Sequence, residues 1–363
     1  MQPIRCSTIS PGVPEFIKLL SPPWTCRFPT VLNVNTVIMN AITKLSGMTV
    51  TLSTLSKEKG WRTEHLYQYK SFWFTSEAVE MVKRAQQYFK AQPTDILLAT
   101  FPKSGTTWFK ALIFSLMSRV RFDFSSHPLL TKDPMIAFPS WKPSYKMKLP
   151  TKIIEFLVPH VVVFSPPTFL NLCCKIMYVY RETKDVFVSN WHYMKKLRPK
   201  QLPSFPIEDA FGLFCKGVSH FGSIWDHVSG YWKASLENPD KFLFLTYEDM
   251  KTDPVVCLTK LAKFLDKPFC LEETQEAVQE ILRLCSFENL SSLEVNQTGV
   301  QHFSPQLAVE NRHFLRKGQV GDWRNHITLE MAAQLDEITR QKLHGTSLIE
   351  TLFVDTIPYS TKA

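Results

Sequence analysis

The sequence predicts a single α/β domain in which helices flank a central parallel sheet. Short apolar runs of strand length alternate along the chain with longer segments whose apolar residues recur at helical spacing. One of these strands is followed at once by a glycine-containing turn and a helix start. A chain of 363 residues with 44% hydrophobic residues can bury a sizeable core. Charged residues at 21% and only 12 glycines exclude a disordered or collagen-like chain.

The elements follow one another in an order typical of such a fold. Apolar spacing over 75–89 predicts a helix, and the run 95–100 then predicts a buried strand. A second helix is expected after the turn that follows this strand. The remaining expected strands are 160–164, 175–180 and 241–246, and the remaining expected helices are 184–196, 207–217, 253–266, 271–284 and 328–343.

Residues 1–57 differ in composition from residues 58–363, to which we assign the folded domain. They are rich in Ser, Thr and Pro, and Glu15 is their only acidic residue. A basic, hydroxylated and acid-poor segment fits a transit peptide. The alternative is a disordered or mis-assigned extension whose true start is Met39 or Met48. Composition leaves both interpretations open.

The eight cysteines form no CxxC pair, which favours reduced thiols in a cytosolic or similar compartment. No apolar run reaches the 18 to 20 residues, roughly, that cross a bilayer, so no membrane partner is expected. Lys and Arg number 42 against 33 Asp and Glu, a net charge of +9 that favours an anionic ligand. Nucleic acid is disfavoured because the basic residues concentrate in motifs suited to a small anion.

The strand 95–100 leads into the turn FPKSGTTW at 101–108. Gly105 lets the backbone approach a ligand, and we expect Thr106 and Thr107 to cap the following helix. Free N–H groups at a helix start bind anions, and Lys103 adds a full positive charge. The lysine precedes the glycine, so this is not a Walker A motif, and an ATP-dependent phosphotransferase is disfavoured. For SGTT alone, the alternative is a capped helix after a strand.

Two further basic segments suit a phosphate. Arg181 follows the strand 175–180, at the sheet edge where open α/β folds bind ligands, and Ser189 lies about two helical turns further on. Near the end of the chain, RKGQVGDWRN at 316–325 can wrap a phosphate with side chains and backbone N–H groups together. Taken singly, a surface arginine and a solvated charged loop are the alternatives.

Together the segments PKSGTTW, YVYRETKDVFVSNWHY at 178–193 and RKGQVGDWRN resemble the cytosolic sulfotransferase family in order and spacing. The likeness is greatest to the plant, flavonol-sulfotransferase-like branch, because SKEKGW at 56–61, FCKG at 214–217 and YEDM at 247–250 also match. The resemblance covers residues 52 to 345. It implies transfer of a sulfonate from 3′-phosphoadenosine 5′-phosphosulfate (PAPS) to a hydroxyl group, with no metal.

The resemblance also implies a role for each matching residue. Lys103 would act as a catalytic residue that stabilises the leaving phosphate, within a turn that holds the 5′-phosphosulfate. Arg181 and Ser189 would bind the 3′-phosphate, and the 316–318 segment would close over it. Trp108 and Tyr247 would contact adenine, and Phe287 is a further candidate for that region. The residues that would bind the cosubstrate are Lys103, Ser104, Gly105, Thr106, Thr107, Trp108, Arg181, Ser189, Tyr247, Arg316, Lys317 and Gly318.

The family also uses one histidine as a general base, because the attacking hydroxyl must lose its proton. This histidine usually stands in a Thr-His-Leu or Thr-His-Ile triplet, and the sequence has none. His160 lies 14 residues before Cys174-Lys175, near the expected place, and is our candidate base. The alternatives are that His160 is a structural core histidine, or that the stretch 131–173 is rearranged.

The sequence leaves the finer properties open. The acceptor is expected to be a small hydroxylated metabolite such as a flavonoid, phenolic, steroid or desulfoglucosinolate. A second hypothesis is a catalytically impaired homologue that binds the nucleotide without turnover. The expected state is a monomer or weak homodimer, and the expected location is the cytoplasm, or the plastid if residues 1–57 act as a transit peptide.

Overall fold

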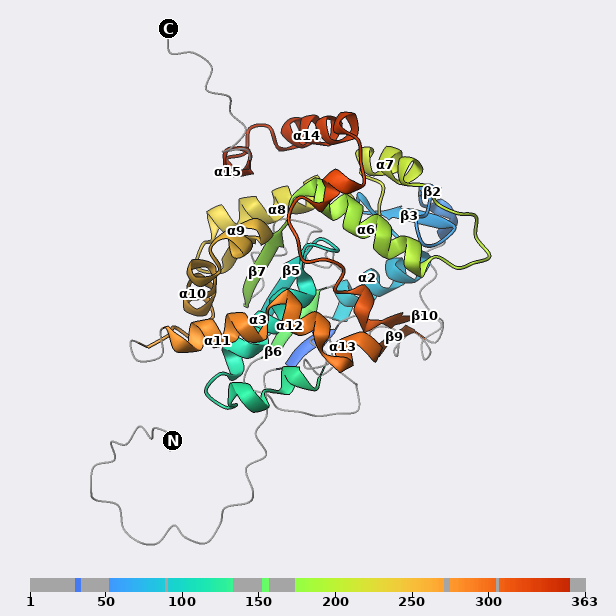
Figure 1. Ribbon diagram of the computed structural model, residues 1–363. Coiled ribbons are helices and arrows are strands. Elements are labelled where there is room, and N and C mark those ends of the chain that lie inside the picture. The colour runs from blue at the N-terminus through green and yellow to red at the C-terminus, as the bar shows by residue number, and fades with distance from the viewer. Residues whose placement is uncertain are drawn as a thin grey trace, which may run out of the picture.

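The computed structural model describes residues 30–33, 52–88, 91–132, 152–156, 174–270, 275–304 and 307–352. A five-stranded sheet with the order β1-β6-β5-β7-β8 runs through these residues (Figure 1). Every neighbouring pair in it is parallel. The strands are β1 (Thr30–Asn33), β5 (Ile96–Thr100), β6 (Lys152–Phe156), β7 (Lys175–Tyr180) and β8 (Phe242–Thr246). The predicted α/β class with a parallel sheet is therefore confirmed.

Helices cover both faces of the sheet, because side chains of the strands alternate between two cores. Leu97, Ile176 and Tyr178 pack into one core, while Leu98 and Met177 pack into the other. The first core is completed by α2 (Ser76–Tyr88), α6 (Thr183–Leu197), α7 (Ile207–Cys215), α8 (Ile224–Glu237), α14 (Leu329–Leu343) and α15 (Leu348–Leu352). The second is completed by α3 (Thr106–Ser118), α9 (Tyr247–Thr252), α10 (Pro254–Phe264), α11 (Glu276–Leu284) and α12 (Phe287–Ser292).

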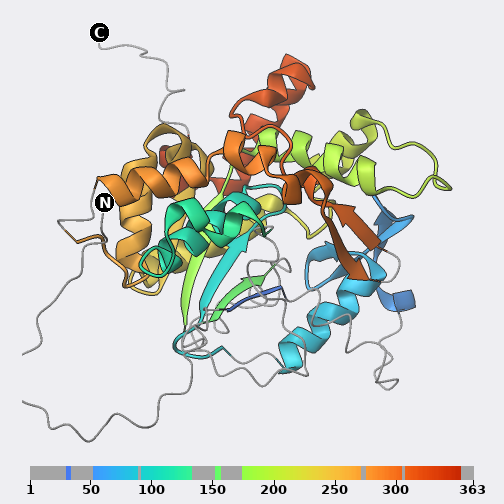
Figure 2. The same ribbon diagram turned by 60° about the horizontal axis from the view of Figure 1, so that its bottom comes forward.

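Two small antiparallel sheets lie outside this layered body. One has the order β2-β3-β4, from β2 (Lys57–Lys59), β3 (His65–Tyr69) and β4 (Phe72–Phe74). The other pairs β9 (Val300–Ser304) with β10 (Leu307–Glu310), after the short helix α13 (Glu294–Thr298). Both views place the β9–β10 hairpin beside α2 (Figures 1 and 2). Neither sheet was predicted from the sequence.

Most elements lie where the sequence predicts them. Strand β7 has the predicted bounds, and β5 and β8 begin one residue later than expected. The strand expected at 160–164 falls outside the described residues, whereas β6 at Lys152–Phe156 is an element that we did not predict. Strand β1 lies within residues 1–57 and pairs with β6 at the edge of the sheet. Helix α8 also escaped the sequence analysis, although its apolar side chains complete a core.

The topology brings three sequence motifs to one edge of the sheet. Thr100 of β5 lies opposite Val179 of β7, and Tyr180 of β7 lies opposite Thr246 of β8. The residues that follow these strands therefore leave the sheet side by side at its carboxyl end. This is where open parallel sheets bind ligands. Among the described residues, no helix is long and apolar enough to cross a membrane.

Candidate active site

A cavity of about 530 Å³ opens at the carboxyl edge of the sheet. Its volume lies within the range of about 300–1,000 Å³ that is usual for small-molecule sites. Every residue of the predicted cosubstrate set except Ser104 lines it, as does Phe287. Ser104 is fully buried beneath the turn, where its backbone N–H donates to the carbonyl of Phe101 (3.2 Å). Segments separated by more than 200 residues thus meet in one cavity.

The turn after β5 is built by backbone conformation. Lys103 and Gly105 both have positive φ, +71° and +98°. A Cβ on Gly105 would lie 2.7 Å from the Tyr247 ring, so glycine is required there for space as well as for φ. Gly105 is the N-cap of α3 and makes no side-chain cap. The expectation that Thr106 and Thr107 cap the helix is wrong, because both lie inside α3 and the Thr106 hydroxyl instead pairs with that of Thr100 (2.6 Å).

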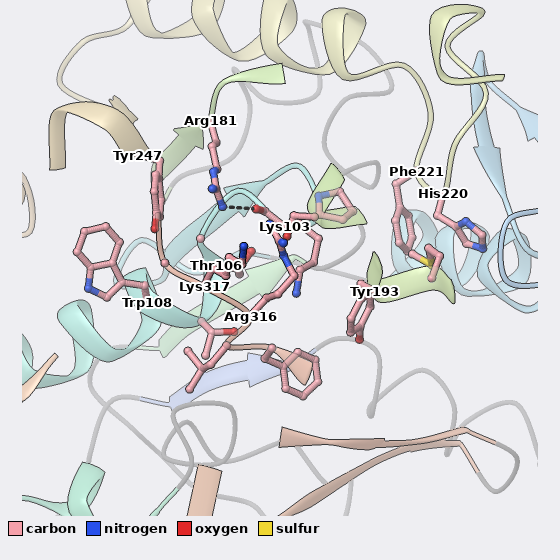
Figure 3. Close-up of a pocket in the computed structure, with 18 of the residues that line it drawn as sticks. Lys103, Thr106, Trp108, Arg181, Tyr193, His220, Phe221, Tyr247, Arg316 and Lys317 are labelled. Atoms are coloured by element: carbon pink, nitrogen blue, oxygen red, sulfur yellow. Dashed lines mark hydrogen bonds between the residues drawn. The ribbon is translucent and has the colours of Figure 1, made fainter. Parts of the chain in front are cut away.

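Lys103 lies at the centre of the cavity with two other cations, Arg181 and Arg316, around it (Figure 3). Its Nζ donates to the carbonyl of His313 (3.2 Å) and lies 4.4 Å from the centre of the Tyr193 ring. Burial, and after it the charges of Arg316, Arg181 and Lys196, lowers the pKa of Lys103 to about 7. Like charges held this close are stabilised by an anion between them. The geometry therefore fits an anionic ligand.

Arg181 is positioned by the loop that follows β10. Its Nη2 donates to the carbonyl of Gln319 (2.7 Å), and its Nη1 donates to the carbonyl of Lys103 (3.4 Å), the bond drawn in Figure 3. The guanidinium also lies 4.3 Å from the centre of the Tyr247 ring. Its Nε is buried and has no partner among the described residues. A buried N–H of this kind is available to a ligand oxygen.

Asp185, fully buried in the first turn of α6, ties this loop to the sheet edge. It accepts hydrogen bonds from the backbone N–H groups of Gly321 (2.7 Å) and Trp323 (3.0 Å), and from Arg181 (3.3 Å). Asp185 was not predicted from the sequence to have a role. The signal that could have found it is an acidic residue in the first turn of the helix that follows Arg181.

Asp322 holds the two basic side chains of the loop. Arg316 Nη1 and Lys317 Nζ each lie 2.6 Å from one of its carboxylate oxygens. Hydrogen bonds from Lys317, Arg316 and Asn325 outweigh the effect of burial and hold the pKa of Asp322 well below its ordinary value. Arg316 Nε is buried without a partner in the described part of the chain. The loop thus presents cations to the cavity while one carboxylate balances them.

Aromatic side chains flank the charged centre on one side. The rings of Trp108 and Tyr247 meet edge to face, 5.2 Å apart, and Phe287 packs against Gly318 so closely that a Cβ there would lie 2.5 Å away. Gly318 has a φ of +66°. A flat ring system could stack among these groups beside the cations. A cluster of cations beside a slot between aromatic rings fits a nucleotide that carries more than one phosphate.

The other side of the cavity is mostly apolar. Figure 3 shows His220 and Phe221 on the far side of Lys103 and Tyr193 from Trp108 and Tyr247. Phe74, Met81 and Leu197 line the cavity as well. These residues come from β4, α2, α6 and the loop before α8, and the sequence analysis named none of them as functional. His160, the predicted base, lies outside the described residues.

The comparisons with known proteins place this geometry in a family. The family described as the sulfotransferase domain matches residues 93–347. A flavonol 4′-sulfotransferase of Flaveria chlorifolia is 43% identical over 304 residues, covering 82% of this chain and 93% of its own. The cytosolic sulfotransferase 12 of Arabidopsis thaliana is 39% identical over 308 residues, covering 82% and 92%.

Solved structures agree with this match. Mouse sulfotransferase SULT7A1, crystallised with PAP, superposes with a TM-score of 0.58 at 27% identity, over 80% of this chain and 99% of its own. Retinol dehydratase in complex with retinol and PAP has the same fold, with a TM-score of 0.58 at 19% identity, over 81% of this chain and 92% of its own.

Proposed function

The chain belongs to the sulfotransferase domain family, and from that premise we propose that it transfers a sulfonate from PAPS to a hydroxyl group of a small metabolite. One observation carries the proposal. Lys103, Arg181 and Arg316 converge beside an aromatic slot at the carboxyl edge of the parallel sheet. PAPS is an adenine nucleotide with one phosphate on the ribose and a phosphosulfate at the 5′ position, so its charges and its ring correspond to these features.

The residues divide into three groups in this proposal. The turn from Lys103 to Trp108 holds the 5′-phosphosulfate, where backbone N–H groups at the start of α3 meet the oxygens. Trp108 and Tyr247, with Phe287, flank the adenine. The 3′-phosphate is bound from two directions, by Arg181 and Ser189 on the β7–α6 side and by Arg316, Lys317 and Gly318 on the loop side.

Transfer requires one bond to form and one to break. The acceptor oxygen attacks sulfur, the bond between sulfur and the bridging oxygen of the 5′-phosphate breaks, and the acceptor proton passes to a base. In this proposal the Lys103 ammonium stabilises the negative charge that develops on the leaving phosphate, since a fixed cation there stabilises the transition state more than the ground state. His160 is proposed as the general base that accepts this proton, on the basis of its position in the sequence.

The acceptor is proposed to be a small hydroxylated molecule such as a flavonoid, phenolic, steroid or desulfoglucosinolate. The relatives include enzymes named for flavonols, which supports an aromatic acceptor. The apolar half of the cavity is consistent with any of these classes. Several relatives are named cytosolic sulfotransferases, which supports a cytoplasmic location, with the plastid as the alternative if residues 1–57 act as a transit peptide.

The test is release of 3′-phosphoadenosine 5′-phosphate (PAP) from PAPS by the purified chain with a pool of phenolic, steroid and desulfoglucosinolate acceptors. We expect acceptor-dependent release that is lost in His160→Ala, with PAP binding retained. A His344→Ala variant is the matched control, because His344 is exposed at the end of α14. PAP binding without release by any acceptor would favour the alternative function, a catalytically impaired homologue. Absence of PAP binding would overturn both.

A further inference from the structure

His220 is a buried imidazole that the reaction described above does not use. It lines the cavity at the end opposite Trp108 and Tyr247 (Figure 3), and its side chain is 3% exposed. Neither ring nitrogen has a hydrogen-bond partner among the described residues. Buried polar groups in proteins are almost always paired, so an unpaired one that faces a cavity indicates a ligand contact.

The backbone around His220 holds the ring in place. Ser219 Oγ donates to the carbonyl of Gly222 (2.9 Å), and the N–H of Gly222 donates to the carbonyl of Ser219 (3.1 Å). The N–H of Phe221 donates to the carbonyl of Trp73 (2.8 Å), which anchors the turn to the β3–β4 hairpin. Phe221 has a φ of +75°, a conformation that aromatic residues rarely adopt. The turn therefore keeps an unfavourable backbone state that presents both rings to the cavity.

The surroundings define which ligand group suits His220. Burial, and after it the Arg62 and Arg198 guanidiniums, holds the pKa of His220 well below its ordinary value, so the imidazole is neutral. A neutral imidazole has one donor and one acceptor nitrogen. A hydroxyl group both donates and accepts, so it satisfies whichever nitrogen it meets, whereas a carbonyl suits only one. Glu77 and Arg62 both line the cavity and interact with each other, so their charges offset one another and a neutral ligand group suits this end.

The walls near His220 define the shape of that ligand. Phe74 and Phe221 meet edge to face, 6.2 Å apart, and both line the cavity, as do Met81 and Tyr193. Aromatic and thioether groups arranged in this way pack well against a flat ring system. A planar aromatic acceptor could therefore extend from the Lys103 centre to His220.

We propose that His220 binds a second phenolic hydroxyl of the acceptor, so that the preferred acceptors are flat aromatic molecules with hydroxyl groups at both ends. One hydroxyl reacts near Lys103, and the other meets the imidazole at the far end of the cavity. This proposal rests on the proposed function, since it concerns the acceptor of the same site. It makes His220 a specificity-determining residue.

The experiment compares three acceptors of one shape: 2-naphthol, 6-methoxy-2-naphthol and 2,6-dihydroxynaphthalene. Two quantities are measured with the full chain: the kcat/KM of each acceptor at saturating PAPS, and the Kd of each acceptor for the protein–PAP complex. We expect the diol to have a kcat/KM about tenfold higher and a Kd about tenfold lower than 2-naphthol, the value of one hydrogen bond between neutral groups. The methoxy compound, which can accept but not donate, falls between them.

The variants isolate the imidazole. His220→Phe keeps the ring volume and removes the nitrogens, so the preference for the diol should disappear. His220→Gln keeps a donor and an acceptor and should restore part of it. His344→Phe, an exposed histidine, is the control and should keep the full preference. PAP binding and Tm establish that each variant is folded, and the comparison of acceptors in the unchanged chain remains decisive if His220→Phe does not fold.

Three results would overturn the proposal. The first is an equal Kd for the diol and 2-naphthol in the unchanged chain. The second is a preference that survives in His220→Phe. The third is a fall in kcat by His220→Phe that is the same for all three acceptors, which would place His220 in proton transfer. Failure of the proposed function is distinguishable, because turnover would then be absent while the Kd comparison still decides the role of His220.

Discussion

The two halves of the cavity are built in different ways. The half proposed for the nucleotide is formed by contiguous motifs, the turn 102–108, the helix start 181–189 and the loop 316–318. The half proposed for the acceptor is lined by side chains from β4, α2, α6 and the loop before α8, which share no motif. Backbone geometry and charge dominate the first half, while side-chain shape dominates the second. Each part of the proposed PAPS site is thus formed by residues that are consecutive in the sequence. The proposed acceptor site instead depends on how separate elements pack against one another.

The largest effect is expected at the centre of the nucleotide half. Lys103→Met removes the cation that we assign to the leaving phosphate, and kcat should fall about 10²- to 10³-fold, as when one group that stabilises transition-state charge is deleted. The measurement is kcat at saturating PAPS and acceptor. Lys342→Met, an exposed lysine in α14, is the matched control. A fall in kcat of less than about fivefold would show that Lys103 does not stabilise the leaving phosphate.

Substitution of Asp185 tests whether its hydrogen bonds to the loop 314–325 are needed for stability and for PAP binding. Asp185→Ala leaves two N–H groups and Arg181 without their buried partner, so the free energy of unfolding should fall by about 3–5 kcal/mol. We also expect the Kd for PAP to rise by about 10- to 100-fold, while Asp185→Asn, which keeps one accepting oxygen, loses less. Urea denaturation and calorimetry measure the two effects. Unchanged PAP binding in the folded alanine variant would show that the loop positions itself.

The pH dependence of PAP binding should follow Lys103, whose pKa is lowered to about 7 in the free protein. A bound anion raises that pKa, so above pH 7 binding must take up a proton and PAP affinity should fall by up to about tenfold per pH unit. Below pH 7 the lysine is already charged, and this dependence vanishes. Calorimetry in buffers of different ionisation enthalpy measures the uptake. Lys103→Arg should abolish it, and an unchanged uptake would assign the proton to another group.

The smallest effect is expected in the acceptor half. Met81→Ala removes a flexible side chain from the wall without touching the cation cluster, so the KM for an aromatic acceptor should rise about fivefold, equivalent to about 1 kcal/mol. The KM for PAPS should stay constant. Steady-state kinetics with each substrate varied in turn distinguishes the two. A parallel rise in the KM for PAPS would mean that the two halves are not separable.

Much of the fold could be predicted because its signals are local. Strand β7 and helices α6, α10 and α14 lie close to their predicted positions, since apolar periodicity reports on burial of one face. Helix α8 was missed, and so was β6. Periodicity does not show which apolar runs pair, so the β9–β10 hairpin and the β2–β4 sheet also went unforeseen.

The parallel α/β class and the family could be recognised from the sequence alone, because a phosphate-binding turn requires particular residue types at consecutive positions. The nucleotide-binding residues were also named from the sequence; all of them except Ser104 line the cavity, and their roles remain predictions. His160 remains a prediction made from sequence position alone. The folded structure was needed to show that Asp185 ties the distant loop to the sheet edge. It was also needed to show that His220 faces the cavity with no hydrogen-bond partner in the part of the chain that the structure describes. Such roles depend on which neighbours a side chain meets after folding, and those neighbours lie far away along the chain.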